Sequence, residues 1–168
     1  MHLFFWQSKL DDNMVVLSLE LKEEEEKVQA KVKWNGQMSF TGMSASGVQI
    51  PIDASKEAGG QDSGARPMEL ILHGLAGCTG IDIISILTKM RLEVRSFYIE
   101  VEGTRADDHP KRFTDIHIHY VLEGDLPEDK VVRAIQLSKE KYCSVSHSLN
   151  ANITASYSIN GVKGKNHL

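Results

Sequence analysis

The chain has 168 residues, of which 41% are hydrophobic and 25% are charged, so it can bury the core of one domain without metal or disulfide crosslinks. Its net charge of −4 gives no general affinity for phosphate backbones, which argues against a nucleic-acid partner. His73, Asp82 and glycines interrupt the apolar stretch 71–87, so no run reaches the roughly 18 residues that span a bilayer, and the apolar start lacks a basic n-region. We therefore expect a cytoplasmic protein with no membrane contact.

The first 26 residues are expected to form an N-terminal extension. Residues 14–21 are nearly continuous β-forming apolar residues, which suggests a strand, but 22–27 is a run of like charges that is typical of a solvated turn. The main domain is therefore expected to cover residues 27–168.

The start of this domain has the pattern of a β-hairpin. Apolar and polar residues alternate from Val28 to Trp34, and the alternation resumes after Asn35-Gly36, a dipeptide that favours a two-residue turn. A further strand is predicted over 48–52. Residues 57–65 contain three glycines and are predicted to form a mobile loop that leads into a helix.

A long apolar helix is predicted over 67–91. Pro67 suits the first helical position, and the segment has no polar side before Lys89. A helix that is apolar on nearly every face must be enclosed by the rest of the protein. Gly74, Gly77 and Gly80 allow a close approach of another element, or a kink.

Strands are predicted at 95–102, 115–122 and 152–159, with His117 and His119 on the solvent side of the second. Asp125-Leu-Pro-Glu128 has the form of a capping box that opens a second helix, and 144–150 could add one or two helical turns. Strands, a buried helix, more strands and a second helix indicate an α+β fold, with antiparallel sheets packed on a central helix.

The two cysteines, Cys78 and Cys143, leave several readings open. They could pair in a secreted protein, but in a reducing compartment they are more often inert core thiols or a redox pair. A reactive cysteine needs a cation, a helix N-terminus or a donor that favours its thiolate. On a regular helix Asp82 lies about 40° from Cys78, where a carboxylate disfavours the thiolate, whereas Cys143 precedes the first amides of a new helix.

A zinc site is another alternative, with the cysteines joined by His73 and His147. The closely spaced ligand pairs typical of structural zinc sites are missing, however, so no metal and no other cofactor is expected.

Two segments together carry a resemblance. RPMELILHGLAGCTGID at 66–82 and YCSVS at 142–146 resemble the paired signature of the OsmC/Ohr superfamily, in which a proline-led buried helix holds one cysteine and a later Cys-Ser-Val-Ser segment holds another. The likeness extends from about residue 27 to residue 162, and its details are similar to the YhfA-like branch. The resemblance favours the redox interpretation of both thiols over inert packing.

The resemblance implies an intertwined homodimer with active sites at the subunit interface. It implies that the protein reduces organic hydroperoxides or hydrogen peroxide, with Cys78 oxidised to a sulfenic acid and Cys143 closing a disulfide that a dithiol reductant reopens. Glu69 is carried over as a third catalytic candidate.

The sequence departs from the family peroxidases in two places. They have an Arg in the N-terminal loop, but 36–47 contains no Arg or Lys, and they have a Glu directly after the helix-opening proline, where this chain has Met68. Glu69 follows one position later, rotated by about 100° on the helix, so it is either a displaced catalytic acid or a partner of the helix dipole. Arg66, Met68 and Asp82 are candidate substrate-binding residues, and Arg66 could supply the missing cation or simply be solvated.

Two functions remain in competition. The first is a thiol-dependent peroxidase, favoured by the two cysteines. The second is a non-catalytic protein that binds a small apolar or thiol-reactive ligand at the dimer interface, favoured by the missing Arg and displaced Glu.

Overall fold

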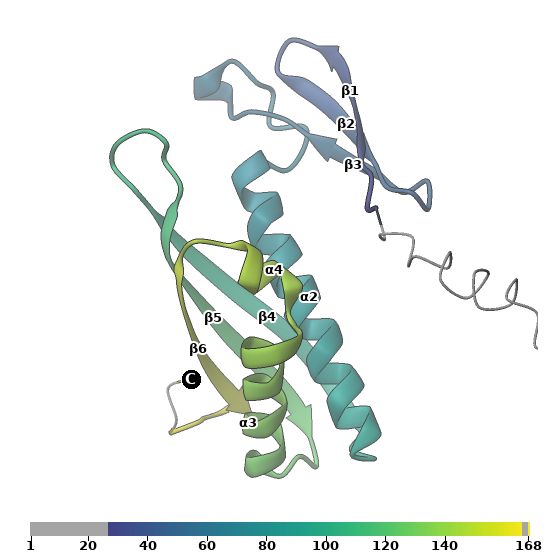
Figure 1. Ribbon diagram of the computed structural model, residues 1–168, viewed down its shortest axis with the longest axis vertical. Coiled ribbons are helices and arrows are strands. Elements are labelled where there is room, and N and C mark those ends of the chain that lie inside the picture. The colour runs from purple at the N-terminus through teal and green to yellow at the C-terminus, as the bar shows by residue number, and fades with distance from the viewer. Residues whose placement is uncertain (1–26, 166–167) are drawn as a thin grey trace, which may run out of the picture.

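The structure is a computed structural model that describes residues 27–165 and 168 (Figure 1). The expected extension 1–26, with its strand at 14–21, lies outside the described residues. The strands are β1 (Lys31–Gly36), β2 (Ser39–Met43), β3 (Gln49–Ile52), β4 (Val94–Arg105), β5 (Phe113–Gly124), β6 (Asn152–Ile159) and β7 (Val162–Lys163). The helices are α2 (Pro67–Lys89), α3 (Glu128–Leu137) and α4 (Ser144–Ser148), with a 3₁₀ turn η1 (Lys56–Ala58) and a π-helical turn η2 (Ser138–Tyr142).

These elements form two separate sheets. Strands β1, β2 and β3 make an antiparallel sheet that stands away from the rest of the chain beyond the N-terminal end of α2, as Figure 1 shows. Strands β4 to β7 make the second sheet, which carries α2, α3 and α4. The predicted α+β class is confirmed, with α2 as the long central helix.

The first hairpin turns later than its sequence predicts. The pairing Gly36↔Ser39 encloses Gln37 and Met38 as the turn, so the prediction of a turn at Asn35-Gly36 is wrong. Both Gly36 (φ 108°) and Gln37 (φ 48°) have positive φ. The register also shifts between Trp34 and Gly36, where β1 advances by two residues while β2 advances by one. This bulge places one extra residue of β1 before the turn.

The second sheet contains a parallel pair that the prediction of antiparallel sheets did not include. Strand β5 pairs with β4 in antiparallel register but with β6 in parallel register, from Asp115↔Asn152 to Leu122↔Ile159. Parallel neighbours need a crossover, and α3, η2 and α4 provide it.

The core lies between the second sheet and its helices. Alternate residues of β5 are buried, and they face one stripe of α2 together with the inner face of α3. The buried residues on the two helices are Leu75, Thr79, Ile83, Leu87, Val131, Ala134 and Ile135. His117 and His119 lie on the opposite face of β5, exposed and half-buried respectively, as predicted.

Helix α2 is unbroken, but the described residues do not enclose it on all sides. Its buried residues follow every fourth position, while Ile81 is 74% exposed and Ile84 is 38% exposed. Contrary to the expectation from the sequence, its length and composition alone would suit a membrane span. Gly80 lets the side chain of Ile99 approach closely, while a Cβ on Gly77 would meet no atom within 4 Å.

Helix α3 begins without the predicted capping box. Its N-cap is Pro127, and no side chain caps the helix. Gly124, three residues earlier, has a φ of 150°. The Pro127 carbonyl accepts the amides of Lys130 and Val131, so the helix starts two residues later than a cap at Asp125 requires.

The segment between β3 and α2 is organised around a buried carboxylate. Asp53, 2% exposed, accepts the amides of Ala54, Gln61 and Ser63 and the Ser63 hydroxyl. The Ser63 hydroxyl and these amides lower the pKa of Asp53 to about 2. The loop predicted to be mobile over 57–65 is therefore held in place at several points.

Candidate functional site

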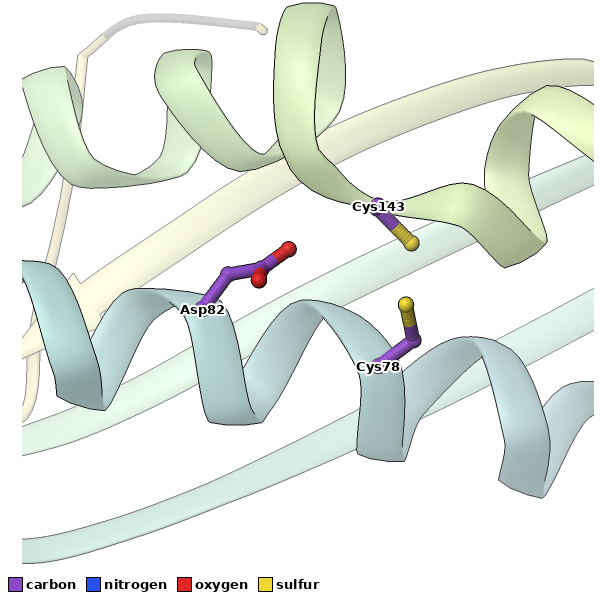
Figure 2. A group of neighbouring side chains, drawn as sticks. All are labelled: Cys78, Asp82 and Cys143. Atoms are coloured by element: carbon purple, nitrogen blue, oxygen red, sulfur yellow. The ribbon is translucent and has the colours of Figure 1, made fainter. Parts of the chain in front are cut away.

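Two thiols and one carboxylate meet at the junction of α2 and α4. Cys78 and Asp82 come from α2, Cys143 directly precedes α4, and the sulfur and carboxylate oxygen atoms all lie within 4.8 Å of one another. Figure 2 shows the two sulfurs pointing toward each other, with the Asp82 carboxylate directed into the same space. Both cysteines are free; Cys78 is half-buried and Cys143 is buried.

Local structure explains this convergence. Residues four apart share a helix face, so Cys78 and Asp82 point to the same side of an unbroken α2. Cys143 has an extended backbone between the π-helical turn η2 and α4, and it is the N-cap of α4. The crossover thus brings a residue 65 positions later in the chain onto the cysteine face of α2.

The Cys143 sulfur accepts a hydrogen bond from the Ser146 amide at 3.4 Å. The sequence predicted this type of help from the first turn. Burial nevertheless raises the pKa of the Cys143 thiol, and the Cys78 thiol beside it acts in the same direction. Burial and the neighbouring thiol therefore oppose the Ser146 amide, which favours the Cys143 thiolate.

A hydroxyl network supports Asp82 from behind. The Ser138 hydroxyl donates to the Asp82 carboxylate at 2.8 Å, and Thr79 Oγ1 lies 2.9 Å from Ser138 Oγ and 2.8 Å from the Tyr120 hydroxyl. Burial raises the pKa of Tyr120 to about 12, so the phenol stays neutral. Ser138, Thr79 and Tyr120 were not among the site residues predicted from the sequence, although a hydroxyl at Thr79 on a nearly apolar helix signals a buried polar partner.

Asp82 has no ion-pair partner within residues 27–165. The ion pairs found there join Arg66 to Asp62 and Glu69, and Lys130 to Asp129. The thiols and the carboxylate therefore form a cluster of acidic groups without a neighbouring cation in the described part of the chain.

Arg66 and Glu69 lie together, away from the sulfurs. Arg66 contacts the Glu69 carboxylate at 3.0 Å and donates its backbone N–H to it at 2.9 Å. That N–H, more than the guanidinium, lowers the pKa of Glu69. Because α2 is unbroken, nine positions place Glu69 about 180° from Cys78, so this pair does not touch the thiols.

Met68 lines a separate apolar cavity of about 470 Å³. Ile71 also lines this cavity. Ile71 precedes Cys78 by seven residues, so the two side chains share a helix face and lie about 10 Å apart along the helix axis. The cavity therefore opens on the cysteine side of α2. The rest of its lining comes from residues 148–151 and from the facing ends of β4 and β5 with their connection, which include Arg105, Lys111 and Arg112.

The histidines of the alternative zinc site do not join the cysteines. His147 Nδ1 lies 3.0 Å from the Cys143 carbonyl oxygen, and His73 lines a cavity with Gly77 and Ile81. Among the described residues, the third group beside the thiols is Asp82, which the sequence analysis had placed on the correct face.

Comparison with known proteins agrees with the resemblance seen in the sequence. A family model described as OsmC-like protein matches residues 60–158. Protein YhfA of Escherichia coli strain K12 is 41% identical over 135 residues, covering 79% of this chain and 98% of YhfA.

Solved structures show the same fold. A hypothetical protein from Aquifex aeolicus, 31% identical, aligns over 80% of this chain and 97% of its own with a TM-score of 0.69. An organic hydroperoxide resistance protein OsmC from Legionella pneumophila, 18% identical, aligns over 79% of this chain and 96% of its own with a TM-score of 0.62.

Proposed function

Because the chain belongs to the OsmC-like protein family, we propose that it is a thiol-dependent peroxidase that reduces organic hydroperoxides or hydrogen peroxide. One observation carries the proposal. Two free thiols from separate elements face each other, one half-buried and accessible, the other buried beside it. This is the arrangement that a peroxidatic and a resolving cysteine require.

The reaction balances with these two residues and an external dithiol. The Cys78 thiolate attacks a peroxide oxygen and breaks the O–O bond, which yields a sulfenic acid and, once the leaving oxygen is protonated, an alcohol or water. The Cys143 thiol then displaces water from the sulfenic acid and forms a disulfide. A dithiol reduces that disulfide and is itself oxidised, which restores both thiols.

The active unit is a homodimer. The chain leaves large apolar side chains exposed on two surfaces, the α2 face around Ile81 and the N-terminal sheet with Val32 (57%) and Trp34 (62%). Large apolar side chains exposed on a folded chain favour an association site. A second copy offers the same pair of surfaces, and an isologous contact can cover both at once.

The cytoplasm is the compartment that suits this chemistry. The OsmC-like fold suggests a soluble protein, in which α2 serves as a core helix. A reducing compartment supplies dithiols and keeps the pair in the thiol state from which each cycle begins.

The test is a peroxide-consumption assay with dithiothreitol, comparing hydrogen peroxide with a bulky alkyl hydroperoxide. Cys78→Ser should abolish consumption. Cys143→Ser should allow one turnover and leave a sulfenic acid on Cys78 that a dimedone probe labels.

Matched variants separate the contributions of the other candidates. Arg66→Ala and Glu69→Ala break an ion pair that does not touch the sulfurs, so both variants should keep most of the activity. Loss of activity in either would assign that residue a role that acts across the subunit interface. The opposite pattern in the two cysteine variants would exchange the roles of Cys78 and Cys143.

A specific observation favours a second function. A carboxylate next to the attacking sulfur, with no cation in contact among residues 27–165, opposes thiolate chemistry. If the wild type consumes no peroxide at any pH, the alternative is a non-catalytic protein that binds a small apolar or thiol-reactive ligand. The cavity bordered by Met68 and Ile71 would then be the binding space.

A further inference from the structure

The geometry of the thiol cluster points to a second use of the same atoms. We propose that the reduced protein binds one Zn²⁺ per chain through the sulfurs of Cys78 and Cys143 and a carboxylate oxygen of Asp82. The fourth position is open to water or a small thiol. The proposal rests on the side-chain cluster and not on the peroxidase activity.

The donor set and its spacing suit this ion. Zinc binds thiolate and carboxylate ligands at about 2.3 and 2.0–2.2 Å in tetrahedral geometry, which places the donor atoms about 3.5–3.8 Å apart. The three donor atoms already lie within 4.8 Å of one another, so side-chain movements of about 1 Å complete the geometry. Two thiolates also select soft or borderline ions over Mg²⁺ and Ca²⁺.

Charge gives an independent reason. Two thiols and one carboxylate lie together, and none of them is paired with Lys or Arg within the described residues. A divalent cation replaces the two thiol protons and neutralises most of the resulting negative charge. Each ion bound releases up to two protons, so affinity should rise with pH.

The surroundings hold the ligands in the orientation that a metal needs. The Ser138 hydroxyl donates to Asp82, the Thr79 hydroxyl contacts Ser138, and the Tyr120 hydroxyl contacts Thr79. The Ser146 amide donates to the Cys143 sulfur. Such outer contacts fix ligand direction in metal sites, and losing one typically costs about 10- to 100-fold in affinity.

Metal binding and peroxide reduction exclude each other at one site. Oxidation to a Cys78–Cys143 disulfide removes both sulfur ligands, so the oxidised protein should release the ion. The bound ion in turn occupies the sulfur that attacks peroxide. The site would therefore respond to both the zinc level and the redox state of its surroundings.

The experiment uses the untagged full chain, reduced and then freed of metal, and Zn²⁺ alone as the probe. Equilibrium dialysis with metal analysis should give about one ion per chain, and none after the disulfide is formed. Co²⁺ should produce a thiolate-to-cobalt charge-transfer band. Cys78→Ser and Cys143→Ser should weaken binding more than about 100-fold, and Asp82→Asn about 10-fold or more.

Controls separate this site from adventitious binding. Asp125→Asn, a matched change outside the cluster, should bind like the wild type. Should a cysteine variant fail to fold, alkylating Cys78 in the wild type serves instead and must abolish the cobalt band. Uptake that survives loss of either thiol, unchanged binding by Asp82→Asn, or no uptake at all overturns the proposal, whatever the peroxidase assay shows.

Discussion

Apolar and polar residues alternate along the strands of both sheets, but the apolar side chains are buried in one sheet and exposed in the other. In β5 every second residue packs into the core, and Ile116, Ile118 and Leu122 are 0–3% exposed. In β1 alternation is equally clear, yet Val32 and Trp34 are more than half exposed. An alternating strand predicts that one face will be covered, but it does not say by which chain. The helices α2 and α3 cover the inner face of the four-stranded sheet, whereas no described residue covers the apolar side chains of the three-stranded sheet.

The largest expected effect is the loss of the second copy that, in the proposed dimer, covers both the three-stranded sheet and the exposed face of α2. Ile81→Lys puts a charge on the exposed α2 face, so light scattering should show the mass falling from a dimer to 18.7 kDa. Amide exchange should then become fast in β1–β3 while β4–β6 stay protected. Val162→Lys, at an equally exposed apolar position (71%) on β7, should remain dimeric. A wild type that is monomeric at micromolar concentration contradicts the comparison.

The next effect distinguishes the two sheets by the source of their stability. Ile83→Ala, at a fully buried position, should lower the free energy of unfolding by about 2–5 kcal/mol at every protein concentration. Val32→Ala should have an effect that depends on concentration, because its contacts form with the partner in the proposed dimer. Urea unfolding followed by circular dichroism at several concentrations measures both. Equal, concentration-independent losses would remove the distinction.

A smaller effect concerns the segment that joins the two regions. Asp53→Asn removes a carboxylate that accepts four hydrogen bonds, so the thermal midpoint should fall at neutral pH. The pKa of Asp53 is lowered from 3.8 to about 2, so its contribution is complete above pH 3.8 and disappears as the pH falls through about 2. The midpoints of variant and wild type should therefore converge in acid. A constant difference down to pH 2 would assign the effect to packing.

The smallest expected effect concerns a hydroxyl contact in the core between the four-stranded sheet and α2. Tyr120→Phe removes the hydroxyl contact with Thr79 and should cost about 0.5–1.5 kcal/mol at neutral pH. Burial raises the pKa of Tyr120 from 10.0 to about 12, so the wild type loses stability as the pH rises from 10 toward 12. The variant has no phenol to ionise and should close the gap in that range. Parallel alkaline profiles would show that the ring, and not the hydroxyl, carries the effect.

Elements that depend on local patterns could be predicted from the sequence. The apolar run after Pro67 predicted α2, and alternation predicted β6 at 152–159, because both signals lie within single segments. The turn at Gln37–Met38 and the uncapped start of α3 could not be predicted in the same way. In each, a favourable local motif, Asn35-Gly36 or Asp125-Leu-Pro-Glu128, gives way to the register or entry angle that the neighbouring element requires.

The two segments that form the site could be predicted separately, but not their contact. Helical spacing placed Asp82 on the face of Cys78, and the segment after Cys143 predicted the amide donor of α4. The meeting of these halves depends on the parallel pairing of β5 with β6, which no local pattern contains. The family resemblance, and not the physical chemistry of either segment, joined the two cysteines in advance.

The position of β6 near the end of the chain has a consequence for biosynthesis. Cys78 leaves the ribosome 65 residues before Cys143, and the strand that anchors the crossover follows later still, at 152–159. Contacts between distant segments form only after the intervening chain is available. The nascent protein therefore carries an isolated thiol on an apolar helix while 65 further residues are added, and the two-sulfur centre forms only once β6 is available to anchor the crossover.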